Sequence, residues 1–217
     1  HRGFGSPASF GLLSPDHPFY NPDTPDYPHD PKRARKILIS LGYEKNKAGY
    51  FEKNGVPLKV QVLASNITVA GESMSDRDGE VLKKQLQTIG IEVSLVNLEQ
   101  ATADARIRDW EFDLAITGHG GLLGDAIILD RMINPERVGS VSSARYGGSP
   151  LLLNLLDLQM SEMDERKRKG LVYKIQELYA DELPAISLYY PASMAAYNPK
   201  KGIVWYYTRG GIALGVP

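Results

Sequence analysis

Hydrophobic residues recur with a helical period over residues 31–41. They share one predicted helix face, formed by Ala34, Ile37, Leu38 and Leu41. Asp30 is a typical N-cap residue, Pro31 fits the first helical position, and Gly42 is typical of the position just after a helix. The pattern predicts a helix that ends at Leu41 and buries this face.

Beyond this helix the pattern indicates a hairpin and then strands and helices in alternation. Asn54-Gly55 is a strong signal for a two-residue turn, and it lies between the strand-like residues 50–53 and 56–58. The alternation follows as strand 58–64, helix 75–90, strand 91–97, helix 99–109 and strand 112–117. This order predicts an α/β fold with parallel pairing, because each helix carries the chain back between strands. Further helices are predicted near 125–132, 150–163 and 164–181.

The first 29 residues follow neither pattern. Seven of the 14 prolines lie at or before Pro31, and proline fixes φ and withholds an N–H donor. The stretch is therefore predicted to be extended. Its large apolar residues favour docking on the rest of the chain, since disordered tails are usually poor in aromatics. They are Phe10, Leu12, Leu13, Phe19, Tyr20 and Tyr27. A loosely attached tail is the alternative.

Composition narrows the classes of function. The 25 Lys and Arg residues balance 26 Asp and Glu residues, which leaves a net charge of −1 and no basic field for nucleic acid. The chain has no Cys, so disulfides, thiol nucleophiles and Cys-ligated metals are excluded. No apolar run approaches the roughly 20 residues of a membrane span. Position 1 is His and no signal peptide is visible, so we expect a processed chain or a fragment.

The strongest candidate for a site is the segment Thr117–Asp125, with four glycines in the eight positions from 118 on. It follows the third strand of the alternation, and ligands of open parallel sheets bind outside the carboxyl ends of strands. Glycine there lets a ligand approach the backbone closely. We therefore predict His119, Gly120 and Asp125 as ligand-binding residues, with an ordinary tight loop as the alternative. Asn66, after the first strand of the alternation, is a further candidate, although it also begins an N-glycosylation sequon.

Catalytic and metal sites find little support in the sequence. His119-Gly120-Gly121 is similar to the oxyanion loop of esterases, but no G-x-S-x-G nucleophile elbow follows it. A dinucleotide fingerprint that starts at Gly118 fails at Leu123. No two histidines have the H-x-x-x-H spacing of a metal site, and the four are His1, His17, His29 and His119. No metal and no cofactor is predicted.

The charged cluster Asp164–Gly170 has its acids first and its bases one turn later. This order matches the dipole at the start of a helix. The cluster is therefore interpreted as a solvated helix face and not as a binding patch.

Three stretches of the sequence, in this order, resemble one family. They are DPKRARKILISLGY with NGVPLKVQVL, then LKKQLQTIGIEVSLV with WEFDLAITG, and then ERKRKGLVYKIQELYADELPAISLYYPASMAAYNPKKG. Together they cover most of residues 30–202. The family is that of the peptide/nickel-type extracellular solute-binding proteins of ABC importers, family 5, and the similarity is to its C-terminal half.

The resemblance implies one lobe of a periplasmic-binding-protein type II-like receptor, with a mixed, mainly parallel sheet flanked by helices. It implies no enzymatic activity and no cofactor. The expected segments are a docked proline-rich segment at 1–29, a solute-binding lobe at 30–197 and a closing segment at 198–217 that returns toward a missing N-terminal lobe. The expected partners are a peptide or other small solute and an ABC permease, not nucleic acid. The expected location is extracytoplasmic, as a lipoprotein anchored to the membrane through the missing N-terminus.

The resemblance also points to site residues. In relatives the loop after the D-L-A-I strand contributes to the ligand cleft, which corresponds to Thr117–Asp125, and Tyr146 matches a position that often faces the ligand. Peptide-binding members commonly carry an aromatic residue in this loop and, three positions later, an Asp that pairs with the α-amino group of the peptide. With His119 in the aromatic position, the Asp position is Leu122, and Asp125 is the alternative. The solute class stays open among peptides, oligosaccharides, opines and metal chelates.

Two functions of other classes remain as alternatives. A small α/β hydrolase would use His119 with an acid such as Asp125, and it would need a positioned Ser nucleophile. A ligand-sensing regulatory domain of the same fold would be joined to a kinase or a DNA-binding module. The leading prediction is a receptor that closes two lobes over a polar solute.

Overall fold

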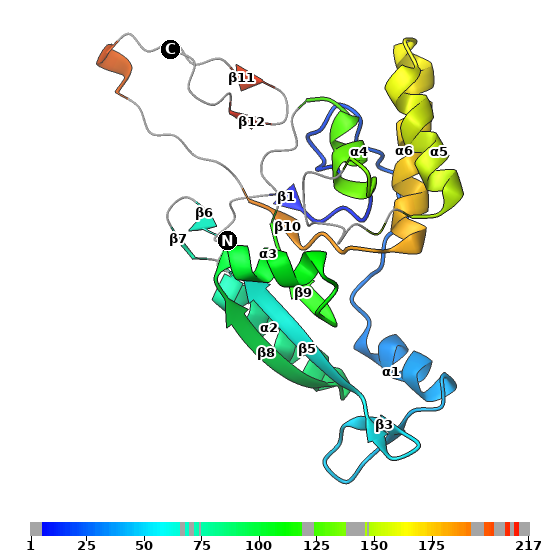
Figure 1. Cartoon of the computed structure of the whole chain (residues 1–217), viewed down its shortest axis with the longest axis vertical. Helices are drawn as coiled ribbons and strands as arrows, with labels where there is room; N and C mark the ends of the chain where they lie inside the picture. Colours follow the sequence, from blue (N-terminus) through cyan, green and yellow to red (C-terminus); the bar gives the residue numbers. More distant parts are fainter. Residues whose placement is uncertain are drawn as a thin grey trace. The chain divides into compact units, whose positions relative to one another are not determined.

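A computed structural model describes residues 6–65, 68–69, 72–73, 75–118, 124–137, 146, 148–191, 198–201, 207–208 and 211–212. The chain forms two compact units (Figure 1). The α/β unit is Tyr27–Gly118, and the helical unit combines His1–Asp26 with His119–Pro217. The predicted segments 1–29, 30–197 and 198–217 concern the division of a larger receptor and stay a prediction.

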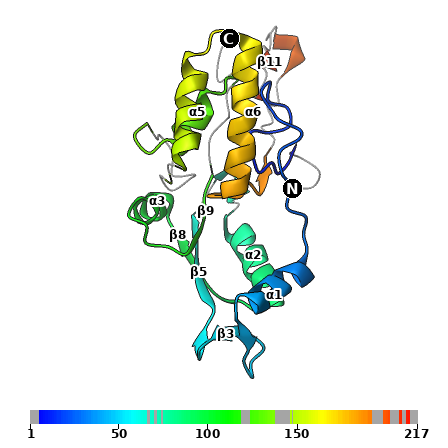
Figure 2. The same ribbon diagram turned by 90° about the vertical axis from the view of Figure 1, so that its right-hand side faces the viewer.

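The α/β unit is built on a three-stranded parallel sheet. Its central strand β5 (Lys59–Ser65) pairs with β8 (Glu92–Leu98) on one side and with β9 (Leu114–Ile116) on the other. The helices α2 (Ser75–Ile89) and α3 (Gln100–Arg108) cover opposite faces of the sheet (Figures 1 and 2). The predicted alternation of strands and helices and the parallel pairing are confirmed.

The core of this unit lies between the sheet and α2. Val62, Val93 and Ile116 are buried, and Leu82 and Leu86 of α2 pack against them. Gly79 lets the helix come close to the strands, because a Cβ at this position would lie 2.9 Å from Leu95 Cδ1. The short strands β6 (Thr68–Val69) and β7 (Glu72–Ser73) pair antiparallel between β5 and α2 along the chain.

A second, antiparallel sheet precedes β5. It consists of β2 (Glu44–Lys45), β3 (Phe51–Lys53) and β4 (Val56–Pro57). The turn between the last two strands has φ of 53° at Asn54 and 77° at Gly55, as a type I′ hairpin requires. The predicted hairpin is confirmed.

The helix α1 (Pro31–Ser40) forms where the sequence predicts it, with the Asp30 carboxylate accepting a hydrogen bond from Arg33 N at 2.8 Å. The expected burial of its apolar face is wrong for this structure. Ile37 is 49% exposed and Leu41 is 56% exposed. The helix packs against α2. Ala34 and Leu38 are half-buried, so this contact covers only part of the apolar face.

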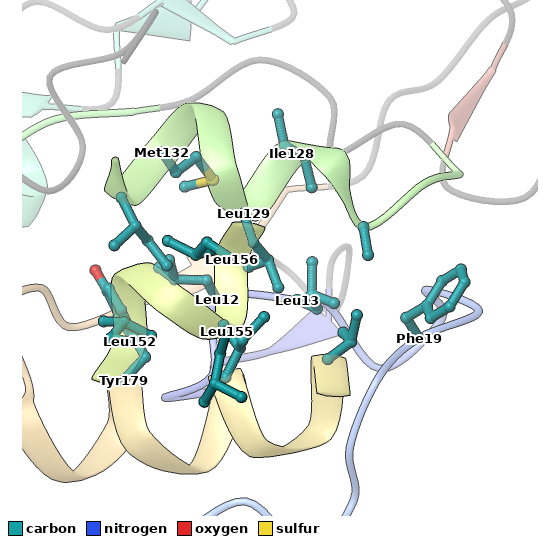
Figure 3. Packing of buried hydrophobic residues seen from close by; sticks show 14 residues of the cluster. Leu12, Leu13, Phe19, Ile128, Leu129, Met132, Leu152, Leu155, Leu156 and Tyr179 are labelled. Atoms are coloured by element: carbon teal, nitrogen blue, oxygen red, sulfur yellow. The ribbon is translucent and has the colours of Figure 1, made fainter. Parts of the chain in front are cut away.

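The helical unit contains α4 (Ile127–Ile133), α5 (Pro150–Ser161) and α6 (Glu165–Glu182). Figure 2 shows α5 and α6 side by side, and Figure 3 shows the apolar side chains gathered between the three helices. The buried cluster consists of Leu12, Leu13, Phe19, Ala126, Ile128, Leu129, Met132, Ile133, Leu152, Leu155, Leu156, Val172, Ile175 and Tyr179. Three of these side chains come from the proline-rich segment, which therefore supplies part of the core.

Polar side chains fasten the proline-rich segment to α6. Gln176 is fully buried, its Nε2 donates to Phe19 O at 2.8 Å, and its Oε1 accepts from Asn21 N at 3.1 Å. Gly11 is required at the same contact, because a Cβ there would lie 2.7 Å from Gln176 Cβ. The side chain of Gln176 thus satisfies buried backbone groups of the proline-rich segment that have no partner in a sheet or helix of their own.

Short elements complete the helical unit. The strand β1 (Ser6–Pro7) pairs antiparallel with β10 (Tyr189–Tyr190), and β11 (Tyr207–Thr208) pairs with β12 (Gly211–Ile212). One turn of 3₁₀ helix is formed by Pro199–Lys201. Among the described residues, no helix is both long enough and apolar enough to cross a membrane.

Candidate functional site

The carboxyl ends of β5 and β9 lie next to each other in the parallel sheet. Ala64 is in register with Ile116, and the buried Ser65 hydroxyl donates to Ile116 O at 3.1 Å. The chain continues directly from these strand ends into Asn66 and into Thr117. The carboxyl ends of β5 and β9, which precede Asn66 and Thr117 in the sequence, therefore lie at the same end of the sheet.

Three of the five predicted ligand-binding residues fall outside the described part of the chain. They are Asn66, His119 and Gly120. Their roles stay predictions. Asp125 and Tyr146 are described, and both belong to the helical unit.

Asp125 lies just before α4, and its carboxylate is engaged by hydrogen bonds. Oδ1 accepts from Ile127 N at 2.8 Å and from Arg168 Nη2 at 2.6 Å, and Oδ2 accepts from Arg168 Nη1 at 2.9 Å. The bidentate hydrogen bond from Arg168 lowers the pKa of the Asp125 carboxyl below its ordinary value. Asp125 is therefore ionised and paired at neutral pH.

Arg168 also contacts residues other than Asp125. Its Nε donates to Gln159 O at 3.1 Å, its Nη2 donates to Gln159 Oε1 at 3.2 Å, and its guanidinium carbon lies 5.4 Å from the centroid of the Phe19 ring. Only 20% of the side chain is exposed. Arg168 thus joins the proline-rich segment, the start of α4, α5 and α6.

The interpretation of Asp164–Gly170 as a solvated face is wrong for Arg168. The reason lies in its position on α6, since it precedes Val172, Ile175 and Tyr179 by four, seven and eleven residues. These three side chains are fully buried, and this spacing places Arg168 on the same helix face. The spacing was the signal in the sequence that could have identified Arg168.

Tyr146 lies near Glu182, the last residue of α6, and is 42% exposed. Desolvation, followed by the negative charge of the adjacent Glu182 carboxylate, raises the pKa of the Tyr146 phenol. Glu182 Oε2 also accepts from Ser149 N at 3.1 Å, at the start of α5. Glu182 was not among the residues predicted from the sequence.

The structure does not bring Asp125 and Tyr146 together. Their partners on α6, Arg168 and Glu182, are 14 residues apart (182 − 168). At 1.5 Å per residue this is about 21 Å along the helix. The two described candidates therefore belong to separate regions of the helical unit. Within the residues that the structure describes, no group of three or more His, Asp or Glu side chains is arranged to hold a metal ion.

Comparison with protein families gives one match that covers more than half of the chain. Residues 2–128 match the model "Bacterial extracellular solute-binding proteins, family 5 Middle". The chain belongs to this family. The resemblance seen in the sequence is therefore confirmed.

Curated relatives support this assignment. The chain is 24% identical to the nickel-binding periplasmic protein of Escherichia coli (strain K12) over 197 residues, which is 90% of the chain and 37% of that protein. It is 27% identical to the di/tripeptide-binding protein 4 of Pseudomonas aeruginosa (strain UCBPP-PA14) over 195 residues, 87% of the chain and 33% of that protein. The chain thus spans about a third of the length of these relatives.

Solved structures show the fold. The oligopeptide-binding protein AppA of Bacillus subtilis, in complex with a nonapeptide, superposes with a TM-score of 0.71 at 20% identity, over 88% of this chain and 37% of that one. This similarity shows that the chain shares the fold of that protein, and the predicted α/β fold class is confirmed.

Proposed function

We propose that the chain is part of the solute-binding receptor component of an ABC importer. This receptor captures a peptide or a similar polar solute and delivers it to a permease in the membrane. Family membership is the observation that carries the proposal. The parallel sheet agrees with it, since β5 and β9 end side by side, and open α/β sheets bind ligands outside the carboxyl ends of their strands.

In this proposal the solute is bound between two lobes. The chain spans about a third of its relatives, so the other lobe is assigned to the remaining part of the receptor. A solute closes the lobes only if it binds the closed form more tightly than the open form. The chain alone should then bind solute weakly, because half of the contacts would be missing.

The proposed ligand-binding region is the glycine-rich segment Thr117–Asp125, with Asn66 from the neighbouring strand end and Tyr146 as further candidates. Support for the segment comes from its place after β9. Support for Tyr146 comes from its exposure, which leaves the ring accessible next to Glu182. Neither a metal nor a cofactor is part of the proposal.

We assign the receptor to the extracytoplasmic side of the membrane, because the relatives include a protein named as periplasmic. A lipid anchor at the N-terminus of the receptor and the closing role of residues 198–217 belong to the same proposal. Peptides are the leading solute class, because a di/tripeptide-binding protein and a structure with a nonapeptide are among the proteins that the chain resembles.

Calorimetric titration of the full-length receptor tests this function. The probes are separate pools of di- to pentapeptides, oligosaccharides and nickel chelates, with recovery of intact solute as a second readout. We expect tight binding of one pool and full recovery of the solute. Hydrolysis of the bound probe would contradict the proposal and favour the hydrolase with His119. Absence of binding to every pool would contradict it in favour of the sensing domain.

A further inference from the structure

One end of the α/β unit carries an excess of positive charge. Residues 27–58 contain seven Lys and Arg side chains and three acids, whereas the whole chain has a net charge of −1. Six of the basic side chains are exposed, and we call them the basic surface. They are Lys32, Arg33, Lys36, Lys45, Lys47 and Lys53. Within the part of the chain that the structure describes, none of the six forms an ion pair.

The charges on α1 are opposite to those that a helix start favours. Unpaired N–H groups make the first turn of a helix positive, so acids are stabilising there and bases are stabilising in the last turn. The helix α6 follows this rule with Glu165 in its first turn. The helix α1 has no acid in its first turn beyond the N-cap Asp30, and no base in its last turn. An anion next to this helix start would relieve the repulsion between the like charges.

Exposed apolar side chains lie beside the basic ones. At 3.6 residues per turn, Ile39 lies on one side of Lys36 around α1, and Ile37 lies on the other. The part of α1 that faces away from α2 is therefore both basic and apolar. The exposed apolar residues of this end of the unit are Ile37, Ile39, Leu41 and Val56.

The hairpin joins α1 to the amino end of the parallel sheet. Lys53 Nζ donates to Leu41 O at 2.8 Å, and Val56 is the cross-strand partner of Lys53. Phe51 N donates to Gly90 O at 2.7 Å, which attaches the hairpin just before β8 (Figures 1 and 2). The seven residues of β5 span about 20 Å, so the basic surface is far from the carboxyl ends of the strands. Docking of the basic surface would leave the proposed ligand-binding end of the unit accessible.

We propose that the basic surface docks on a membrane that contains anionic lipids. The headgroup phosphates complement the Lys and Arg side chains, and the aliphatic side chains beside them can enter the boundary between headgroups and acyl chains. The six flexible side chains come from α1, β2, β3 and the turn between these two strands, which suits a fluid layer of headgroups better than the fixed charges of a protein. The inference goes beyond the proposed function and does not depend on a bound solute.

Vesicle binding of the full-length receptor, produced without a lipid anchor, tests the proposal. The vesicles consist of phosphatidylcholine, alone or mixed with phosphatidylglycerol, and cosedimentation gives the partition coefficient. The charge variant combines Lys32→Gln, Arg33→Gln and Lys36→Gln. The exchange variant combines Lys32→Arg, Arg33→Lys and Lys36→Arg and keeps the charge. The isoleucine variant combines Ile37→Gln and Ile39→Gln and removes exposed apolar area.

The start of α6 offers a matched control. Arg166→Gln, Lys167→Gln and Lys169→Gln together remove the same number of positive charges from exposed positions. Acidic residues directly precede these positions in the sequence, so this region lacks the uncompensated charge of α1. The Tm of every variant is measured to verify folding, and Lys36→Gln alone replaces the charge variant if that variant does not fold.

The wild type should bind the mixed vesicles and not those of phosphatidylcholine alone, and high salt should weaken this binding. The charge variant should lower the partition coefficient by more than about tenfold. The isoleucine variant should lower it by about threefold, because less apolar area enters the membrane. The exchange variant and the α6 control should stay within about twofold of the wild type.

Equal losses in the charge variant and the α6 control would overturn the proposal, since only the net charge of the receptor would then matter. Absence of wild-type binding to the mixed vesicles would overturn it as well. In that case a lower Tm of the isoleucine variant would indicate that the rest of the receptor covers α1. Capture of the wild type by poly-glutamate, lost in the charge variant, would instead indicate an acidic protein partner.

Discussion

The two units of the chain are specified in different ways. In the α/β unit, most elements follow from residues close in sequence, such as Asp30-Pro31 before α1 and Asn54-Gly55 between β3 and β4. In the helical unit, buried side chains join segments that are far apart in sequence, as Gln176 does with Phe19 across 157 positions. Local periodicity therefore predicts the first unit well and the second only in part.

The largest expected effect contrasts two isoleucines on helices. Ile175 of α6 is fully buried, whereas Ile37 of α1 is 49% exposed. Ile175→Ala should lower the free energy of unfolding by about 3 kcal/mol, because it leaves a cavity in the core. Ile37→Ala should cost less than about 1 kcal/mol. Denaturant titration of both variants of the chain checks this, and equal losses would contradict the exposed face of α1.

The next effect concerns the polar attachment of the proline-rich segment. Gln176→Ala should destabilise the chain by about 2 kcal/mol, because Phe19 O and Asn21 N lose their buried partner. Gln85→Ala is the matched control on the exposed side of α2. Thermal unfolding of both variants measures the difference. A loss in Gln176→Ala no larger than in the control would mean that the segment is not held through Gln176.

Two glycine-to-alanine substitutions should change the free energy of unfolding in opposite directions. Gly55 has φ of 77° and open space around it, so Gly55→Ala adds only backbone strain and should cost about 1 kcal/mol. Gly170 lies inside α6 with open space around it, so Gly170→Ala should stabilise the chain by about 0.5 kcal/mol. Unfolding curves of the two variants check the signs, and a stabilising Gly55→Ala would contradict the type I′ turn.

The smallest effect is a pH dependence from Asp125. Because hydrogen bonding to Arg168 lowers the pKa of Asp125 in the folded state, the pair contributes stability above the ordinary Asp pKa. This contribution is lost as the pH falls through the lowered value. The difference in Tm between the wild type and Asp125→Asn should therefore shrink as the pH falls from about 5 to about 3. A difference that grows over this range would contradict the pairing, and Arg168→Gln should behave like Asp125→Asn.

The sequence predicts the hairpin, the three strands of the parallel sheet and the helix starts because their signals are local. It fails for the burial of α1, because burial depends on what packs against the helix and not on its own periodicity. The interpretation of Asp164–Gly170 as a solvated face is wrong for Arg168 because it rests only on the order of the charges. The alignment of Arg168 with Val172 and Ile175 on one helix face contained the better signal.

The candidate site also has one part that the sequence predicts and one part that it does not. The place of the glycine-rich segment follows from the order of strands, which the sequence contains. The partners of Asp125 and Tyr146 do not, since Arg168 and Glu182 lie more than 30 residues away along the chain and meet them only through packing. The sequence therefore predicts where a site lies better than it predicts what each residue there does.

In the proposed function a solute is captured between two lobes, one of which this chain helps to form. Small-angle X-ray scattering of the full-length receptor, with and without the solute pool that binds in calorimetry, tests this claim most directly. The account predicts a smaller radius of gyration that saturates at the same solute concentration as the binding heat. Binding heat without any compaction would contradict it.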